Sequence, residues 1–153
     1  NFVIPNEKGD LVSLKDFRGK NVILAFYNNW CGPCVNDLNN LEIINNYFKD
    51  KKNLAIACIS MDPPAEFKEF IKLNKFVGVQ LNGFENKELI SNYNIESVPQ
   101  YFLIDKSGLM YGEKLIEPSN DEGRELIKQI ERLIGQWYNA EIQKFIFDKQ
   151  SQN

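Results

Sequence analysis

The sequence of 153 residues is long enough for one domain with a sizeable core, and its 43% hydrophobic and 25% charged residues are typical of a globular protein. The net charge of -3 argues against a nucleic acid or an anionic membrane surface as a partner. No apolar run approaches the ~20 residues that a membrane-spanning helix needs. Three cysteines are too few for a fold built on disulfides.

The N-terminal segment predicts a β-hairpin followed by one helical turn. Residues 2–4 and 11–13 are short strand candidates, and Gly9 between them can adopt the positive φ that a tight turn needs. Ser13 is expected to cap a helical turn over residues 14–17.

Two cysteines stand where a buried strand gives way to a helix. An unbroken apolar run over residues 22–27 predicts a strand buried on both faces. A helix is predicted over residues 35–49, because apolar side chains recur there at helical spacing: Val35, Leu38, Leu41, Ile44 and Phe48. Cys31 and Cys34 lie between these two elements.

The chemistry of this junction favours a reactive thiol at Cys31. At a helix N-terminus, unpaired N–H groups and the helix dipole favour a negative charge, so a thiol there loses its proton more easily. Pro33 suits the first helical turn, where no backbone donor is needed. Gly32 and Pro33 form a tight, stiff connection that brings the two sulfurs within bonding reach. We therefore predict a redox-active pair.

Three other interpretations of the pair compete with this one. A structural disulfide that closes so short a loop constrains the unfolded chain little. A zinc site needs about four ligands, usually Cys and His, but the sequence has no histidine and only one further cysteine, Cys58. Such a site would need carboxylates or a second chain. Chance occurrence is the third alternative.

The middle of the chain alternates strands and helices, which implies parallel pairing of the strands. Residues 53–60 predict a buried strand, in which Cys58 is interpreted as a small core residue. Asp62 is expected to cap the helix that follows. A weaker strand is predicted over residues 77–81 and a short helix over residues 85–93.

The last third predicts a strand, a turn and a long helix. Residues 98–104 form a strand opened by Pro99, and residues 109–111 return antiparallel after a turn. A helix begins at Ser119 or Asn120, and its inner face comprises Leu126, Ile130, Leu133, Ile134 and Trp137. Beyond it, Ile142, Phe145 and Ile146 recur at helical spacing and predict a last helix that packs on the body, or else contacts another domain or chain.

The sequence Trp30-Cys31-Gly32-Pro33-Cys34 is identified as the active-site motif of the thioredoxin family. The N-terminal segment resembles the opening of its TlpA/ResA-like branch at Phe2, Gly9, residues 12–14, Phe17 and residues 19–20. The later chain resembles that branch's cis-proline strand and hairpin at residues 97–99, residues 102–105 and Gly108. The match covers residues 2 to 134 and implies a thioredoxin-like α/β fold: a central mixed β-sheet flanked by helices, with an N-terminal β-hairpin extension.

The resemblance also implies a division of the chain. Residues 1–138 are expected to form the thioredoxin-like domain. Residues 139–153 are expected to form a C-terminal helical extension that packs on the same domain.

The branch implies a thiol-disulfide oxidoreductase that acts outside the cytoplasm, in the bacterial periplasm or anchored to a membrane and facing it. As a reductase, the Cys31 thiolate attacks a protein disulfide to form a mixed disulfide, and Cys34 then releases the reduced substrate. The partners would be protein thiols and disulfides together with an upstream thiol reductant. No cofactor or metal is implied beyond the Cys31–Cys34 pair.

The same resemblance implies the residues that receive the substrate. The Val98–Pro99 bond is expected to be cis and to lie beside the cysteine pair, which leaves the backbone of Val98 free to pair with an extended substrate. Trp30 would form one wall of the site, and Gly32, Pro33 and Pro99 would also contact the substrate.

Asp37 is a candidate for proton transfer at Cys34. The two lie three residues apart and so share one face of the helix. The branch commonly has a glutamate here that assists the buried cysteine, whereas this sequence has the shorter aspartate, with Asn39 in place of a proline that often kinks the helix. The alternative is an ordinary solvated acid of the first turn. Thioredoxin's own buried aspartate is replaced by Ala25.

Two other functions compete with the reductase. A peroxiredoxin would have a threonine three residues before the reactive cysteine, where this sequence has Asn28. A thioredoxin-like binding module could carry the disulfide without using it. The Gly-Pro pair between the cysteines resembles the reducing members of the family.

Overall fold

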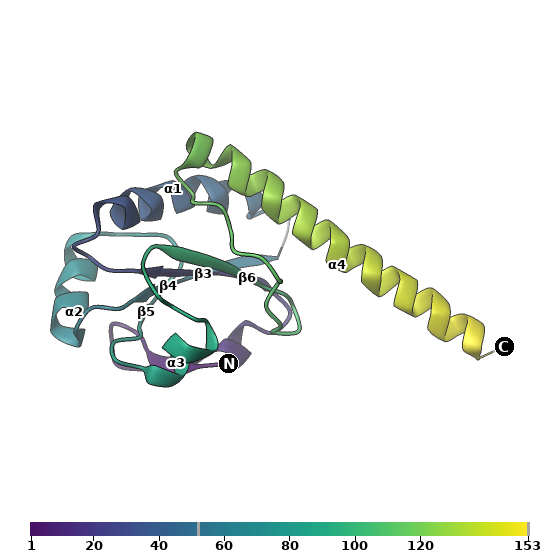
Figure 1. Ribbon diagram of the computed structural model, residues 1–153, viewed down its shortest axis with the longest axis horizontal. Helices are drawn as coiled ribbons and strands as arrows, with labels where there is room; N and C mark the ends of the chain where they lie inside the picture. The colour runs from purple at the N-terminus through teal and green to yellow at the C-terminus, as the bar shows by residue number, and fades with distance from the viewer. Residues whose placement is uncertain (52, 153) are drawn as a thin grey trace.

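The computed structural model describes residues 1–51 and 53–152, except for the side chains of Trp137 and Tyr138. Its centre is a four-stranded sheet in the order β5-β4-β3-β6 (Figure 1). The strands are β3 (Asn21–Tyr27), β4 (Leu54–Ser60), β5 (Val79–Asn82) and β6 (Gln100–Ile104). β4 is parallel to β3 and to β5, whereas β6 is antiparallel to β3, so the sheet is mixed as predicted.

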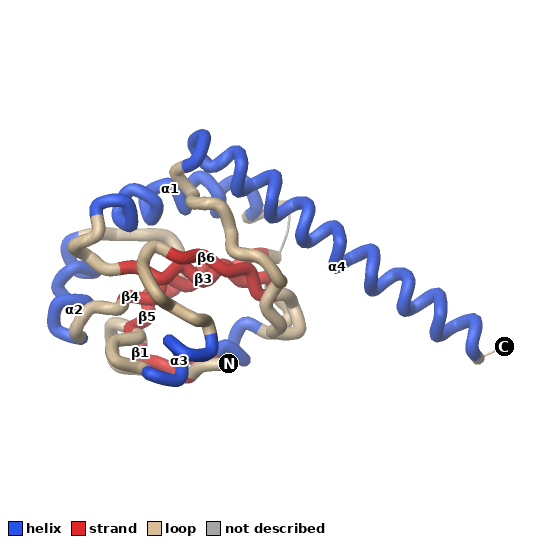
Figure 2. Tube along the Cα trace, viewed as in Figure 1, coloured by secondary structure: helices blue, strands red, loops and turns tan. Residues whose placement is uncertain are grey.

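Helices cover both faces of this sheet (Figure 2). One face carries α1 (Gly32–Phe48) and the first half of α4 (Arg124–Ser151). The opposite face carries α3 (Lys87–Asn92), the 3-10 turn η1 (Leu14–Phe17) and the N-terminal hairpin. Helix α2 (Pro64–Leu73) lies beyond β4 and β5. Its Phe70 side chain packs against the core on the α1 side of the sheet.

The side chains of β3 explain why this strand is apolar throughout. Ile23, Ala25 and Tyr27 belong to the core beneath α1, while Val22, Leu24 and Phe26 belong to the core on the other face. Every residue of the strand is buried. Successive side chains of a strand point to opposite faces, so a strand covered on both sides loses the polar alternation of an edge strand.

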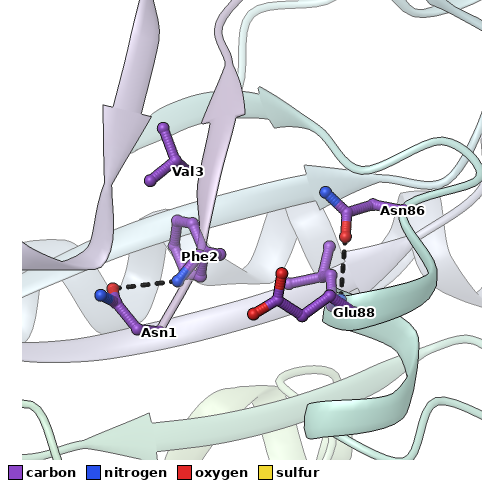
Figure 3. Close-up of a pocket in the computed structure, with 6 residues that line it drawn as sticks. Asn1, Phe2, Val3, Asn86 and Glu88 are labelled. Carbon is purple, nitrogen blue, oxygen red and sulfur yellow. Dashed lines mark hydrogen bonds between the residues drawn. The ribbon is translucent and has the colours of Figure 1, made fainter.

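The N-terminal hairpin forms as predicted. Strands β1 (Val3–Pro5) and β2 (Leu11–Ser13) pair antiparallel, and Gly9 has a φ of 85° in the turn between them. Ser13 accepts from the Lys15 N–H and so caps η1. The first residues lie against the start of α3 and enclose a small cavity with Asn86 and Glu88 (Figure 3).

The strand predicted after the β6 turn does not form as a regular strand. Residues 109–111 form an isolated bridge, Ile104 to Met110, rather than a strand. The Asp105 carboxylate accepts from the Ser107 N–H, the Ser107 hydroxyl and the Leu109 N–H, so it organises a tight turn without a longer ladder. A 3-10 turn, η2 (Asn120–Gly123), then precedes α4.

Helix α4 runs without a break over Arg124–Ser151 and passes through Gly135. Its first half packs on α1 and the sheet through Leu126, Ile130, Leu133 and Ile134, whereas the side chain of Trp137 lies outside the described residues. The helix then leaves the body, as Figure 1 shows.

The C-terminal extension expected over residues 139–153 is therefore the continuation of α4 through Ser151 and not a separate packed helix. Ile142, Phe145 and Ile146 are exposed by 38%, 62% and 42%, because the straight helix carries them past the edge of the domain. None of the described helices is both long enough and apolar enough to cross a membrane.

Candidate redox site

The cysteine pair occupies the connection between β3 and α1. Cys31 is the N-cap residue of α1, and Pro33 lies in the first turn. Cys31 and Cys34 form a disulfide with their Cα atoms 5.2 Å apart, and the Cys34 N–H donates to the Cys31 sulfur over 3.2 Å. When the pair is reduced, this donor and the helix dipole would stabilise a thiolate at Cys31.

The two cysteines differ in access. Cys31 retains 8% of its surface and Cys34 none. Of the two residues, Cys31 is therefore the one that a substrate can approach. Trp30, which precedes it, is 75% exposed.

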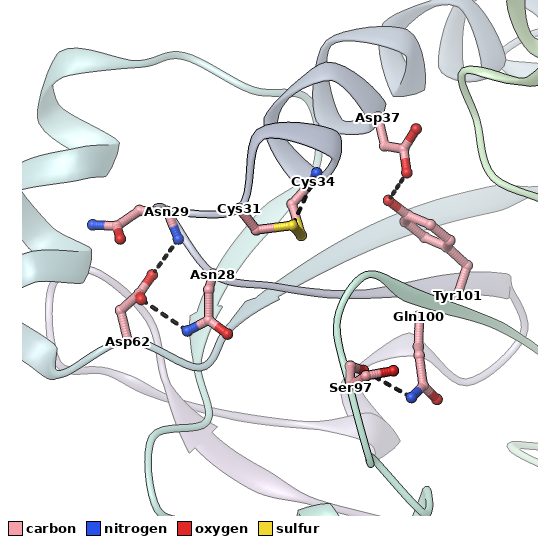
Figure 4. The surroundings of a disulfide bond; sticks show 9 residues. All are labelled: Asn28, Asn29, Cys31, Cys34, Asp37, Asp62, Ser97, Gln100 and Tyr101. Carbon is pink, nitrogen blue, oxygen red and sulfur yellow. Dashed lines mark hydrogen bonds between the residues drawn. A yellow bond between two sulfur atoms is a disulfide. The ribbon is translucent and has the colours of Figure 1, made fainter.

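Asp62 anchors the loop in front of the cysteines. Its carboxylate accepts from the Asn28 side chain at 2.8 Å and from the Asn29 N–H at 2.8 Å (Figure 4). The Ser60 hydroxyl donates to it at 3.1 Å, and the aspartate is 1% exposed. A buried carboxylate with several donors holds a fixed geometry, so Asp62 fixes the backbone that leads to Trp30.

The prediction that Asp62 caps α2 is wrong. The N-cap of α2 is Pro63, without a side-chain cap. A signal for the actual role was present in the sequence. Asn28 and Asn29 follow β3, Asp62 follows β4, and the ends of parallel strands meet at one edge of the sheet.

A groove lies on the Trp30 side of the pair. A cavity of about 420 Å³ has mostly apolar walls formed by Trp30, Met61, Ile90, Ile95 and Val98. Among the described residues that line it, Glu96 is the only charged one. The Val98–Pro99 bond is cis, as predicted. The Gln100 amide donates to the Ser97 carbonyl at 2.7 Å and braces this loop near the disulfide (Figure 4). The structure thus brings Trp30 and Val98 to one surface, while Gly32 and Pro33 lie in the first turn of α1.

Asp37 is buried, with 1% of its surface exposed, so the alternative of a solvated acid is wrong. The Tyr101 hydroxyl donates to its Oδ2 at 2.6 Å, and the Ser119 N–H donates to its Oδ1 at 3.2 Å (Figure 4). Both oxygens of the carboxylate therefore have a donor from outside α1.

The role of Tyr101 was not predicted, because in the sequence it is one more residue of an apolar strand. It lies opposite Ala25 of β3, and both face α1. Burial, followed by the hydrogen bond and the charge of Asp37, raises the pKa of Tyr101 far above its usual value. The available signal was the strand alternation, which places Tyr101 on the same face as Ala25.

The AhpC/TSA family profile matches residues 1–111, which is more than half of the sequence. The chain belongs to the AhpC/TSA family. A ResA thiol-disulfide oxidoreductase from Bacillus thuringiensis subsp. konkukian is 32% identical over 133 residues, which cover 85% of this chain and 75% of that protein. The expected membership of the ResA-like branch is thereby confirmed.

Two solved structures show the same fold. The thioredoxin domain of a thiol-disulfide oxidoreductase from Bacteroides vulgatus superimposes with a TM-score of 0.72 at 27% identity, covering 86% of this chain and 91% of that one. StoA from Bacillus subtilis superimposes with a TM-score of 0.61 at 20% identity, covering 79% and 92%. This member of the AhpC/TSA family thus has the thioredoxin-like fold that its motif predicts.

The third cysteine of this family member, Cys58, lies within the core. Cys58 is fully buried in β4, and its thiol lies 3.6 Å from the Val77 carbonyl. Burial raises the pKa of Cys58 to about 12, so the thiol is protonated at neutral pH. These properties agree with a core residue.

Proposed function

We propose that this thiol-disulfide oxidoreductase reduces disulfides in protein substrates through a cycle of the Cys31–Cys34 pair. One observation carries the proposal. An accessible sulfur at the N-terminus of α1 is bonded to a fully buried one, directly beside the exposed Trp30 and an apolar groove. The relatives named ResA support the same class of reaction.

The reaction begins with the reduced pair. The Cys31 thiolate attacks one sulfur of the substrate disulfide, and the other substrate sulfur leaves as a thiolate. Cys34 gives its proton to Asp37 and attacks the Cys31 sulfur, so the mixed disulfide breaks and the Cys31–Cys34 disulfide forms. Two electrons have then passed to the substrate, whose second thiolate is protonated. An upstream thiol reductant restores the pair.

The groove beside Trp30 would receive the substrate chain. Its apolar walls suit an uncharged side chain next to the reacting cysteine. The Val98 backbone would pair with the extended substrate, with Pro99, Gly32 and Pro33 around the reacting sulfurs. The cycle requires no cofactor or metal beyond the two cysteines.

We place the reaction outside the cytoplasm, in the periplasm or at a membrane facing it, where it would contribute to redox homeostasis. The basis is the similarity to ResA proteins, whose branch has that location. Cysteine pairs outside the cytoplasm meet an oxidising environment, so a dedicated reductant is required to keep this pair reduced.

Reduction of insulin by dithiothreitol tests the proposal directly. The wild-type chain should accelerate it, while Cys31→Ser should abolish the acceleration. A reduction potential near the ~-270 mV of thioredoxin would support a reductase, and one near the ~-120 mV of DsbA would indicate an oxidant. No acceleration would leave a binding module, and consumption of peroxide would indicate a peroxidase.

A further inference from the structure

The buried Asp37 carboxylate is held from two sides by groups outside its own helix. Tyr101 reaches it from β6 and Ser119 from the loop that precedes η2. The bond from Tyr101, at 2.6 Å, is in the short range typical of a hydroxyl that donates to a charged oxygen. The site therefore fixes the orientation of the carboxylate as well as its place.

The neighbouring strand makes room for this contact. Ala25 lies between Tyr101 on β6 and Cys58 on β4, and all three face the layer beneath α1. A larger side chain at residue 25 would occupy the space beside the Tyr101 ring. The acid of this site thus comes from α1, and its partner comes from β6.

We propose that Tyr101 is a positioning residue for the second half of the exchange, because its hydroxyl holds Asp37 ready to take the proton of Cys34. This inference rests on the proposed function and deepens it. Cys34 and Asp37 lie one helical turn apart on α1, and both are buried. Water has little access to this thiol, so a fixed protein base is needed.

The hydroxyl can serve both states of the acid. An ionised carboxylate can only accept hydrogen bonds, and in that state Asp37 accepts one from the Tyr101 hydroxyl and one from the Ser119 N–H. Once it has taken the Cys34 proton, Cys34 attacks Cys31, the bond between Cys31 and the substrate breaks, and the substrate sulfur leaves. A hydroxyl can then rotate and accept from the new carboxylic acid, which a phenyl ring cannot do.

Other titratable groups near the Tyr101 hydroxyl are few. Among the residues that the structure describes, they are Cys58 on β4 and Glu117 in the loop before η2, in addition to Asp37 itself. The raised pKa of Tyr101 keeps its hydroxyl protonated across the neutral range, so it remains a donor.

The test separates the two halves of the reaction. Formation of the mixed disulfide is measured in a Cys34→Ser background with a small model disulfide and no added dithiol. Release of the substrate is measured by single turnover of the reduced chain. Tyr101→Phe should slow release about tenfold at pH 7 and shift the midpoint of its pH profile upward by about one unit, as expected when one hydrogen bond to a charged group is lost. Formation of the mixed disulfide should change less than about twofold, because Cys31 is activated by the helix end.

Tyr111→Phe is the matched control. Its hydroxyl is buried and has no hydrogen-bond partner among the described residues, so its removal should leave the pH profile of release unchanged. Asp37→Asn supplies the second variant, because it keeps an acceptor for Tyr101 but removes the base. In that background Tyr101→Phe should have no further effect on release.

Two results would overturn the inference: a wild-type pH profile in the Tyr101→Phe variant, or the same slowing by Tyr101→Phe when Asp37 is already Asn. Loss of the fold in Tyr101→Phe, judged by its melting curve, would also count against a positioning role and assign the contact to stability. A wild-type chain that reduces no disulfide would overturn the proposed function, which the insulin assay detects separately.

Discussion

The two halves of α4 carry the same apolar spacing but have opposite surroundings. Ile130 is fully buried under the sheet face, while Ile142 on the same helix is 38% exposed. Both are isoleucines of an apolar stripe at helical spacing, one stripe in each half of the helix, although the two stripes lie on different sides of α4. The comparison shows that periodicity identifies the face of a helix that could be buried, and that the rest of the fold decides whether anything covers it.

Ile130→Ala should produce the largest loss of stability. The side chain is enclosed by α1 and the sheet, so its removal leaves a cavity and should cost about 2–5 kcal/mol of unfolding free energy. Urea denaturation measures this. Ile142→Ala, the matched change in the projecting half, should stay within about 0.5 kcal/mol. Equal losses at the two residues would mean that the projecting half is covered in solution.

Asp62→Ala should produce the next largest effect, a loss of about 1.5–3 kcal/mol of unfolding free energy, because it removes a charged acceptor from a buried network of hydrogen bonds. It should also change the rate at which iodoacetamide alkylates reduced Cys31, since the loop ahead of Trp30 loses its anchor. Asp105→Ala is the control, as that carboxylate organises only the turn after β6. A Cys31 rate that responds equally to both changes would contradict the anchoring role.

Cys58→Ala should lower the unfolding free energy by about 1 kcal/mol, the value expected for loss of a buried group of this size. The variant should still reduce disulfides. In the reduced wild-type chain at pH 8, alkylation should spare Cys58. Its pKa is raised to about 12, so the thiolate appears only as the pH approaches that value. Mass spectrometry of the labelled peptides checks this. Rapid labelling of Cys58 at pH 8 would show that β4 opens readily.

Ending the chain at residue 138 should have the smallest effect. Residues 139–151 are exposed and lie past the edge of the domain, so the melting temperature and insulin reduction should match those of the full chain. A markedly lower melting temperature would show that the projecting half stabilises the body, in conflict with its exposure.

The predicted features that the structure confirms are those set by local interactions. The run over β3, the turn at Gly9 and the helix start at the cysteine pair depend on neighbours within a few residues, and all three were predicted. The prediction for Asp62 is wrong, because a carboxylate next to a proline has a strong local reason to cap a helix. A contact with Asn28 across two parallel strands has no local signature.

The sequence alone determined the order of the elements, the two-sided burial of β3 and the chemistry of the Trp30–Cys34 motif, because these follow from spacing and residue type. Only the tertiary structure decided that Asp37 is buried, that Tyr101 donates a hydrogen bond to it, and that α4 leaves the body after its first half. These facts depend on which surfaces meet in space. Burial and hydrogen bonding between distant segments are set by packing, which no window along the chain contains.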